Sequence, residues 1–525
     1  MRFDNMLAEI NGFGRFQLRT FLLLIIPRLT LPFNFLLNNF ITFIPSHHCD
    51  IRSQNNGGVF RNLSLEERLN VNIPFEQDGS LSSCQMFAEP QYQLLSNSSN
   101  LTYIPTMPCQ NGWIYDTTIF RSTLATEWDL VCDKKKMNRA TATIFFVGVM
   151  LGSGIFGFLS DRFGRKKTLL LSYMASFIFG IATALSYNFL MFATMRFCTG
   201  LGLSGISISL EWVEIRHRTT VAVLMSLDWS VGCVILPGVA YLINDWRFLT
   251  AAVISPLFPA MLCWWLPESA RWLMSNGKTD DAHFYLSRCA TVNGREDVMV
   301  LSTVILVEDE NRKYSYLDLV KTPKMRRRAL LSGIVFGVAF AYYGISLNIS
   351  GFGVNIYLTQ FIYGVIEIPA KGFVFFTVDK IGRRWNQAGM LILTGLLIFS
   401  SVFIHADRGD LRTAVGALGK MFSEGSFTIV FLYTTELYPT VMRQNGLGYC
   451  SFMARVGVAV SPLIMLLEDV WVNLPSFVFS LVALGSGLSA SLLPETYNVR
   501  LPETIEDVEQ TTYCQLDGSK QFKHM

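Results

Sequence analysis

Ionisable side chains interrupt several of the long apolar stretches of this 525-residue chain. On insertion scales a charge at the centre of a bilayer costs about 2.5–3.5 kcal/mol, so each such residue marks a candidate functional site. An arginine is permanently charged and can hold a carboxylate with two parallel hydrogen bonds. We therefore predict a site for an anionic group at Arg455, with Lys371 as a second positive charge, unless Glu367 neutralises Lys371 from one helical turn away. Further candidates within these stretches are Arg196, Asp228, Lys420 and Glu424.

Aromatic and amide side chains accompany these charges. A cavity lined by rings and a few cationic groups suits amphipathic organic anions. Helix packing or lipid contact is the alternative for any single ring, because 13% of the residues are aromatic. Buried amides need hydrogen-bond partners, which makes two asparagines of the first apolar stretch further candidates. The predicted lining residues are Tyr342, Tyr343, Tyr357, Phe361, Phe427, Phe431, Asn38 and Asn39.

The sequence shows no pattern of catalytic chemistry. It has no Gly-rich phosphate loop ending in Lys and Ser or Thr, so nothing indicates that ATP drives the protein. It has no Lys/Arg block with interleaved aromatic residues, so nothing indicates nucleic-acid binding. His47 and His48 stand beside Cys49, where a structural role in a disulfide-forming loop explains them better than a metal site. We expect no catalytic residue, no cofactor and no metal.

The composition and the apolar runs predict an all-α membrane protein. The chain is 51% hydrophobic and only 16% charged, whereas soluble proteins carry about 25% charged residues. About twenty apolar residues cross a bilayer. Runs of that order form six spans, a polar segment and six more spans, and the lipid bilayer is therefore a partner of the chain. The twelve runs are 17–45, 140–160, 168–187, 188–210, 219–242, 248–266, 329–349, 354–378, 386–405, 411–434, 445–467 and 470–493.

The positive charges orient these spans. Lys and Arg concentrate in cytoplasmic loops of membrane proteins. With the N-terminus in the cytoplasm, every inner turn bears Arg or Lys, including 161–167 and its copy 379–384, whose aspartates lie 218 positions apart, whereas the short outer turns carry acids as well as a few Arg. The predicted segments are 1–45 (N-terminus and first span), 46–139 (extracellular loop), 140–266 (second to sixth spans), 267–328 (cytoplasmic linker with short helices), 329–493 (seventh to twelfth spans) and 494–525 (cytoplasmic tail).

The loop 46–139 carries the marks of an extracellular, oxidising compartment. Three glycosylation sequons begin at Asn62, Asn97 and Asn100, and such sequons are used on the surface of secreted or exported segments. An even set of cysteines there favours disulfides. Four cysteines permit three pairings, and the sequence does not choose among them. The four are Cys49, Cys84, Cys109 and Cys132.

Several strings resemble known transporters. Gly157 to Lys167 resembles the signature loop of the major facilitator superfamily, and the strings 267–273 and 435–446 resemble motifs shared by its sugar porters and organic ion transporters. The strings 45–49, 112–116, 126–133, 245–247 and 501–507 are similar to solute carrier family 22, the organic ion transporters. The resemblance spans nearly the whole chain and favours the organic anion branch. It implies the major facilitator fold, with two homologous six-helix halves.

The resemblance also implies a function. We expect a plasma-membrane carrier that exchanges organic anions, with carboxylates as the favoured cargo, or passes them alone, by alternating access. Arg455 stands where cation-transporting relatives have Asp, which argues against the first alternative, a carrier of organic cations or zwitterions. The second alternative is a transport-inactive receptor or scaffold. Charged residues at the inner span ends are expected to gate the pathway: Asp161, Arg162, Arg165, Glu211, Arg218, Asp379, Arg383, Glu436 and Arg443.

The fourth span departs from the family pattern. Only fifteen positions separate Arg196 from Glu211, about five fewer than the family has. Five residues turn a helix by about 500°, so the two residues cannot both keep their usual facing. We expect the helix to unwind near Gly200, Gly202 or Gly205, or the chain to be a splice or gene-model form with weakened transport.

Overall fold

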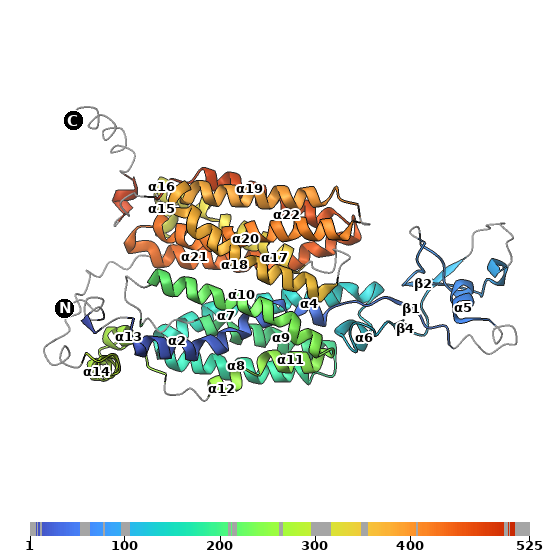
Figure 1. The fold of residues 1–525 in the computed structure, drawn as a ribbon, viewed down its shortest axis with the longest axis horizontal. Coiled ribbons are helices and arrows are strands. Elements are labelled where there is room, and N and C mark those ends of the chain that lie inside the picture. Colours follow the sequence, from blue (N-terminus) through green and yellow to red (C-terminus); the bar gives the residue numbers. More distant parts are fainter. Residues whose placement is uncertain are drawn as a thin grey trace, which may run out of the picture.

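The computed structural model describes residues 13–52, 63–76, 79–95, 105–207, 218–261, 266–295, 317–347, 355–405 and 408–497, together with residues 7, 9, 10, 212, 502 and 505–509. Nine segments among these residues are long and apolar enough to cross a membrane. With α10, the pair α11 and α12, and α19, they form twelve spans in two groups of six. The predicted fold class is therefore confirmed, apart from four short strands outside the membrane part (Figure 1).

The first six spans form the N-terminal half. The first span is broken into three helices, and Pro27 and Pro32 lie beside its first break, where each removes a backbone donor. The helices of this half are α2 (Arg15–Arg28), α3 (Thr30–Leu36), α4 (Asn38–Ile41), α7 (Lys135–Phe163), α8 (Arg165–Ala184), α9 (Phe189–Leu203), η5 (Ser204–Ser207), α10 (Arg218–Leu242), α11 (Trp246–Ile254) and α12 (Leu257–Met261).

The C-terminal half repeats this arrangement. Its spans are α16 (Pro323–Ser332) continued by α17 (Ile334–Leu347), α18 (Ile356–Ile381), α19 (Arg383–Ser401), α20 (Gly409–Leu437), α21 (Arg443–Ile464) continued by η10 (Met465–Asp469), and α22 (Leu474–Ser491). The short η9 (Thr440–Met442) precedes α21. In the segment of the chain that connects the two halves, the helices are α13 (Ala270–Ser275), α14 (Thr279–Asn293) and α15 (Asp318–Lys321).

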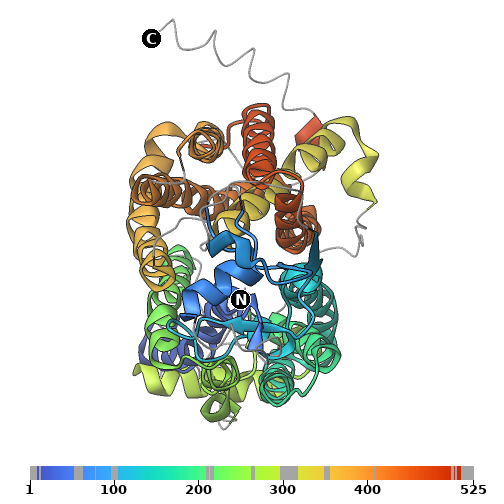
Figure 2. The ribbon, with the colours of Figure 1, turned by 90° about the vertical axis from the view of Figure 1, so that its right-hand side faces the viewer.

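The two halves lie side by side, as the view from the strand-bearing end shows (Figure 2). They touch mainly where α10 packs on α18 and α7 packs on α21. Within the N-terminal half, glycines let α7 and α9 approach closely. A Cβ at Gly200 would lie 2.3 Å from the carbonyl oxygen of Phe145, so no larger residue fits there without moving the backbone.

The fourth span changes helix type near its end. The α-helix α9 stops at Leu203 and continues as the 3₁₀ segment η5, which contains Gly205. A 3₁₀ segment is wound more tightly than an α-helix and turns each residue by a different angle. Gly200 and Gly202 stay α-helical, and the change of helix type lies at Gly205, one of the three glycines where unwinding is predicted. Glu211 lies outside the described residues.

A small disulfide-linked domain caps the end from which α5 (Leu65–Asn72) projects in Figure 1. Strand β1 (His47–Cys49) pairs with β4 (Trp113–Tyr115), and β2 (Gln85–Phe87) pairs with β3 (Thr106–Pro108). The short η3 (Tyr92–Leu95) and η4 (Cys132–Lys134) complete it. Disulfides join Cys49 to Cys109 and Cys84 to Cys132, which decides the pairing that the sequence leaves open. The sequon residues Asn62, Asn97 and Asn100 lie outside the described residues.

Two of the family-like strings meet where this domain joins the membrane part. Glu127 of α6 (Leu124–Trp128) forms an ion pair with Arg247 and accepts a 2.5 Å hydrogen bond from Trp246 Nε1. The ring of Trp128 packs edge-on against Trp246 at 5.4 Å. The strings 126–133 and 245–247 thus fix the domain to the start of α11.

Candidate functional site

A cavity of about 190 Å³ lies between the halves and contains Arg455. Its walls come from α3 and α7 of the N-terminal half and from α17, α20 and α21 of the C-terminal half. Four of the predicted substrate residues line it, namely Arg455, Tyr343, Phe427 and Phe431. The sequence analysis missed Phe35, Phe146, Val149, Ser451, Ala454 and Val458, which complete the lining.

Arg455 brings an unneutralised positive charge to this cavity. Its guanidinium donates to the carbonyl oxygen of Ser451 at 3.2 Å and to the Ser451 hydroxyl, one turn earlier on α21. Its Nε is buried without a hydrogen-bond partner. Within the part of the chain that the structure describes, no carboxylate forms an ion pair with it. Arg455 as a whole is half-buried, and a guanidinium with a free donor at a cavity wall is a ready partner for an anion.

Aromatic rings form the rest of the wall. Phe35 packs edge-on against Phe146 at 5.4 Å, and Phe427 packs against Phe431 at 5.6 Å. Tyr343 contacts Phe146 at 5.3 Å, so rings of the two halves meet across the cavity. Phe35 and Phe146 carried no sequence signal that separated them from the other 39 phenylalanines of the chain.

Lys371 lies in a second group of charges, which we call the tetrad: Glu367 and Lys371 of α18 with Lys420 and Glu424 of α20. Lys371 Nζ is 3.3 Å from Glu424, and Lys420 Nζ is 3.1 Å from Glu367. All four side chains are at most 7% exposed. The predicted neutralisation of Lys371 thus comes from Glu424 across the helix interface, while Glu367 pairs with Lys420.

Neighbouring polar groups complete the tetrad. Lys371 Nζ donates 2.6 Å hydrogen bonds to the Ser226 carbonyl and the Ser230 hydroxyl of α10. The Tyr342 hydroxyl donates to Glu367 at 2.6 Å, and Lys420 Nζ lies 3.1 Å from the centre of the Tyr342 ring. The tetrad carries two positive and two negative groups, and Lys371 is not among the residues that line the Arg455 cavity.

The other ionisable residues of the N-terminal half link its helices. Arg196 is buried, donates to the side-chain and main-chain oxygens of Asn34 at 2.9 and 2.7 Å, and lies over the Phe145 ring at 4.2 Å. Arg28 and Asp228 form a 2.5 Å ion pair between α2 and α10. These contacts give Arg196 and Asp228 a structural role in joining helices of this half.

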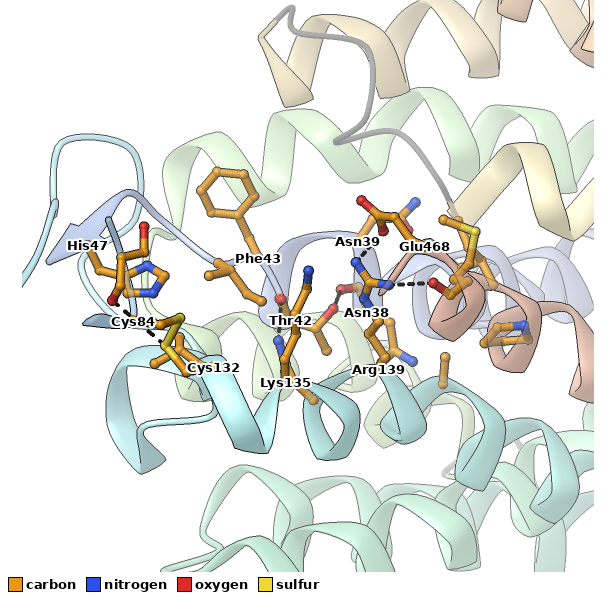
Figure 3. Close-up of a pocket in the computed structure, with 18 residues that line it drawn as sticks. Asn38, Asn39, Thr42, Phe43, His47, Cys84, Cys132, Lys135, Arg139 and Glu468 are labelled. Carbon is orange, nitrogen blue, oxygen red and sulfur yellow. Dashed lines mark hydrogen bonds and ion pairs between the residues drawn. A yellow bond between two sulfur atoms is a disulfide. The ribbon is translucent and has the colours of Figure 1, made fainter. Parts of the chain in front are cut away.

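The remaining predicted lining residues lie toward the disulfide-linked domain. Asn38 and Asn39 line a second cavity, of about 460 Å³, together with Lys135 and Arg139 (Figure 3). Tyr357 of α18 packs there against rings from the N-terminal part of the chain, 5.9 Å from Phe40 and 5.5 Å from Phe120. Phe361 is exposed on the surface of α18.

Contacts that cross between the two halves gather at this end of the molecule. Arg139 of α7 forms an ion pair with Glu468 and donates to the Met465 carbonyl, both of η10 (Figure 3). Lys135 lies 3.8 Å from Asp469. Asn39 donates to the Ser346 carbonyl at 2.8 Å and to the Gln360 side chain at 3.1 Å.

At the opposite end, the described ion pairs each lie within one half. Asp161 pairs with Arg165 at 3.0 Å, and Asp379 pairs with Arg383 at 2.8 Å. Arg383 also lies 3.3 Å from Glu436. Among the other predicted gating residues, Arg162 lies over the Phe163 ring and Arg443 begins α21. Glu211 and the side chain of Arg218 lie outside the described residues.

Two further acids at this end were missed. Glu268 accepts hydrogen bonds from the backbone of Arg165 and Lys166 at 2.8 and 3.0 Å, at the start of α8. Glu495 does the same for Arg383 and Arg384 at the start of α19, at 2.9 and 3.1 Å. A carboxylate at a helix N-terminus satisfies free N–H groups. The repeat of Pro-Glu-Ser at 267–269 as Pro-Glu-Thr at 494–496 was the available signal.

Comparisons with known proteins agree with this architecture. Residues 91–507 match the family described as "Sugar (and other) transporter". Among solved structures, the inward open conformation of the xylose transporter XylE from E. coli matches with a TM-score of 0.55 and 19% identity, over 74% of this chain and 92% of that chain. A partially occluded inward open form of the same transporter matches with a TM-score of 0.53 and 15% identity, over 92% of this chain and 98% of that one. These likenesses establish the fold.

Curated relatives establish the family. The chain is 43% identical to solute carrier family 22 member 7 of Bos taurus, over 97% of this chain and 96% of the relative. It is 44% identical to member 7 of Homo sapiens, with the same two coverages, and 38% identical to member 6-B of Xenopus laevis, over 98% and 96%. Member 7 is organic anion transporter 2, which the sequence motifs also favour. The chain is therefore a membrane transporter that belongs to solute carrier family 22, in its organic anion branch.

Proposed function

We propose that this protein carries organic anions, carboxylates among them, across the plasma membrane by alternating access, as an exchanger or a uniporter. The observation that carries the proposal is Arg455, a half-buried cation in a ring-lined cavity that no described carboxylate neutralises. Its guanidinium would bind the anionic group, and the walls around Phe146, Tyr343 and Phe427 would bind the apolar body.

The contacts between the halves support a defined place in the transport cycle. Pairs such as Arg139–Glu468 close the end near the disulfide-linked domain, which we assign to the cell exterior. At the other end, which we assign to the cytoplasm, Arg165 and Arg383 pair with acids of their own halves. The described state is thus closed on the outside. In the next step the outer pairs would separate, and the halves would rock about the cavity.

Tracer uptake into expressing cells tests the proposal. We expect uptake of a radiolabelled aromatic carboxylate and none of a quaternary ammonium tracer. Replacing Arg455 with Gln removes the charge-assisted hydrogen bonds and should lower carboxylate uptake about 100-fold, corresponding to ~3 kcal/mol. Arg455→Lys, which keeps the charge without the forked geometry, should fall between the two.

Surface biotinylation provides the control, since only variants present in equal amounts at the surface are compared. Undiminished carboxylate uptake by Arg455→Gln would contradict the assignment of the site. Preference for the quaternary ammonium tracer would identify a cation carrier. Absence of all uptake from a well-expressed wild type would favour a receptor or scaffold.

A further inference from the structure

A groove of about 330 Å³ lies at the inner end of the seventh span, far along the chain from the cavity residues of α3 and α7. It runs between α16 and the end of α22, which lie next to each other. In Figure 1, α16 lies at the same end as α13 and α14. Six residues line the groove: Pro323, Arg326, Arg327, Leu330, Leu331 and Leu492.

The four basic residues at the start of this span are Lys324, Arg326, Arg327 and Arg328, and two of them donate hydrogen bonds to main-chain carbonyls of the protein. Lys324 donates to the main-chain carbonyl of Glu509, and Arg328 donates to the Leu437 carbonyl at 2.7 Å. By contrast, Arg326 and Arg327 are exposed, and within the described part of the chain no acid pairs with either. The groove therefore has two guanidinium groups that remain available to an anion.

The other wall of the groove is apolar and faces outward. Leu330 is 69% exposed and Leu492 is 57% exposed. Leu330 follows Arg326 by four residues on a continuous helix, so it lies about 6 Å further along the axis, toward the middle of the span. Charge at the level of the membrane surface and exposed leucines one turn deeper match the two parts of a phospholipid.

We propose that this groove binds an anionic phospholipid of the cytoplasmic leaflet, with its phosphate on Arg326 and Arg327 and an acyl chain along Leu330 and Leu492. Basic pockets between spans on the cytoplasmic side bind such headgroups, and that leaflet carries the anionic lipids. Arginine suits phosphate because its forked donors bind two oxygens at once. A soluble anion would use the arginines and leave the leucines exposed to water. The assignment depends on the orientation given above but not on the cargo.

The site would connect the two helices that form it. Residue 330 belongs to α16 and residue 492 directly follows α22, so one lipid would bridge the inner ends of the seventh and twelfth spans. Because α16 continues into α17, the lipid would be linked through the same span to the helix that carries Tyr343 of the cavity.

Lipid binding to the purified full-length protein in detergent tests the proposal. We expect phosphatidylserine to bind, phosphatidylcholine to bind much more weakly, and soluble glycerophosphoserine not to compete. The double variant Arg326→Gln/Arg327→Gln should lower phosphatidylserine affinity about 30-fold, which corresponds to ~1 kcal/mol per arginine. Leu330→Gln, which keeps both charges, should also weaken binding, by a smaller factor.

The double variant Arg15→Gln/Arg19→Gln is the matched control. It removes two exposed arginines from the inner end of the first span, away from the groove, and should leave the affinity within about threefold of the wild type. If both double variants lost the same amount of phosphatidylserine affinity, binding would depend on surface charge in general and not on this groove, and the proposal would be overturned. Unchanged affinity in the groove variant would also overturn it. Full competition by glycerophosphoserine would show a site for a soluble phosphate instead of a lipid. All of these outcomes are independent of uptake, so they are separate from the test of the proposed function.

Discussion

Arg455 and Lys371 are both positive residues in apolar spans of the C-terminal half, yet the groups that surround their charges differ. Lys371 has Glu424 at 3.3 Å and two serine oxygens at 2.6 Å. Among the described residues, Arg455 donates hydrogen bonds only to Ser451 of its own helix, and rings of four other helices line the cavity beside it. One cation is neutralised and one is not.

The difference shows that the role of a buried charge depends on its neighbours in space. The ion pair of Lys371 and Glu424 joins α18 to α20. The attraction within the pair offsets the cost of removing both charges from water, so Lys371 has no unsatisfied charge for a substrate to neutralise. An unpaired arginine remains costly until an anion binds to it, which supports the proposal that Arg455 binds the cargo.

The largest effect is expected from breaking the tetrad. Lys371→Met leaves Glu424 buried without its partner, which should cost about 3–5 kcal/mol of stability. The double variant Lys371→Met/Glu424→Met removes both charges and should recover most of that loss, as measured by thermal unfolding in detergent. It should also keep carboxylate uptake. A folded double variant without uptake would make Lys371 a substrate ligand after all.

A tenfold or larger effect on uptake is expected from giving Arg455 a partner. Ser451→Asp places a carboxylate one turn from Arg455 on α21, where the serine hydroxyl already accepts its hydrogen bond. Arg455 should then be paired with a carboxylate, as Lys371 is in the tetrad. Carboxylate uptake should fall about tenfold or more, since the cargo must compete with the new acid for the guanidinium. Ser451→Asn, of the same size and neutral, is the control. Equal uptake by both variants would show that Arg455 does not bind the anion.

The smallest effect is expected at the outer end. Arg139 and Glu468 are 19% and 34% exposed, so solvent weakens their pair to about 1 kcal/mol. Arg139→Gln should therefore shift the protein about fivefold toward the outward-open state, so that an impermeant maleimide labels Cys at position 38 (Asn38→Cys) about five times faster. Lys136→Gln, which removes an exposed neighbouring charge, should not change the rate. Slower labelling in Arg139→Gln would show that the pair does not hold the outer end closed.

Much of the candidate site had a local signature. Glu367 and Lys371 on one span and Lys420 and Glu424 on another stand in complementary order, each pair four residues apart, although the sequence does not show that the two spans are neighbours. The repeated Pro-Glu strings at 267 and 494 were likewise visible. Phe35 and Phe146 were not predictable, because phenylalanines that line a cavity look the same in sequence as those that pack between helices.

Sequence alone determined the number of spans, the family strings and the residues that bear charge within the membrane. Those properties are local: a span is a run of apolar residues, and each insertion cost belongs to a single side chain. The tertiary structure decided which charges are neutralised, which cysteines are joined and which end is closed. Each of these depends on groups from different helices or distant loop segments that come within a few ångströms, as Glu424 approaches Lys371 while no described acid approaches Arg455. Only the packing of the two halves brings those groups together or keeps them apart.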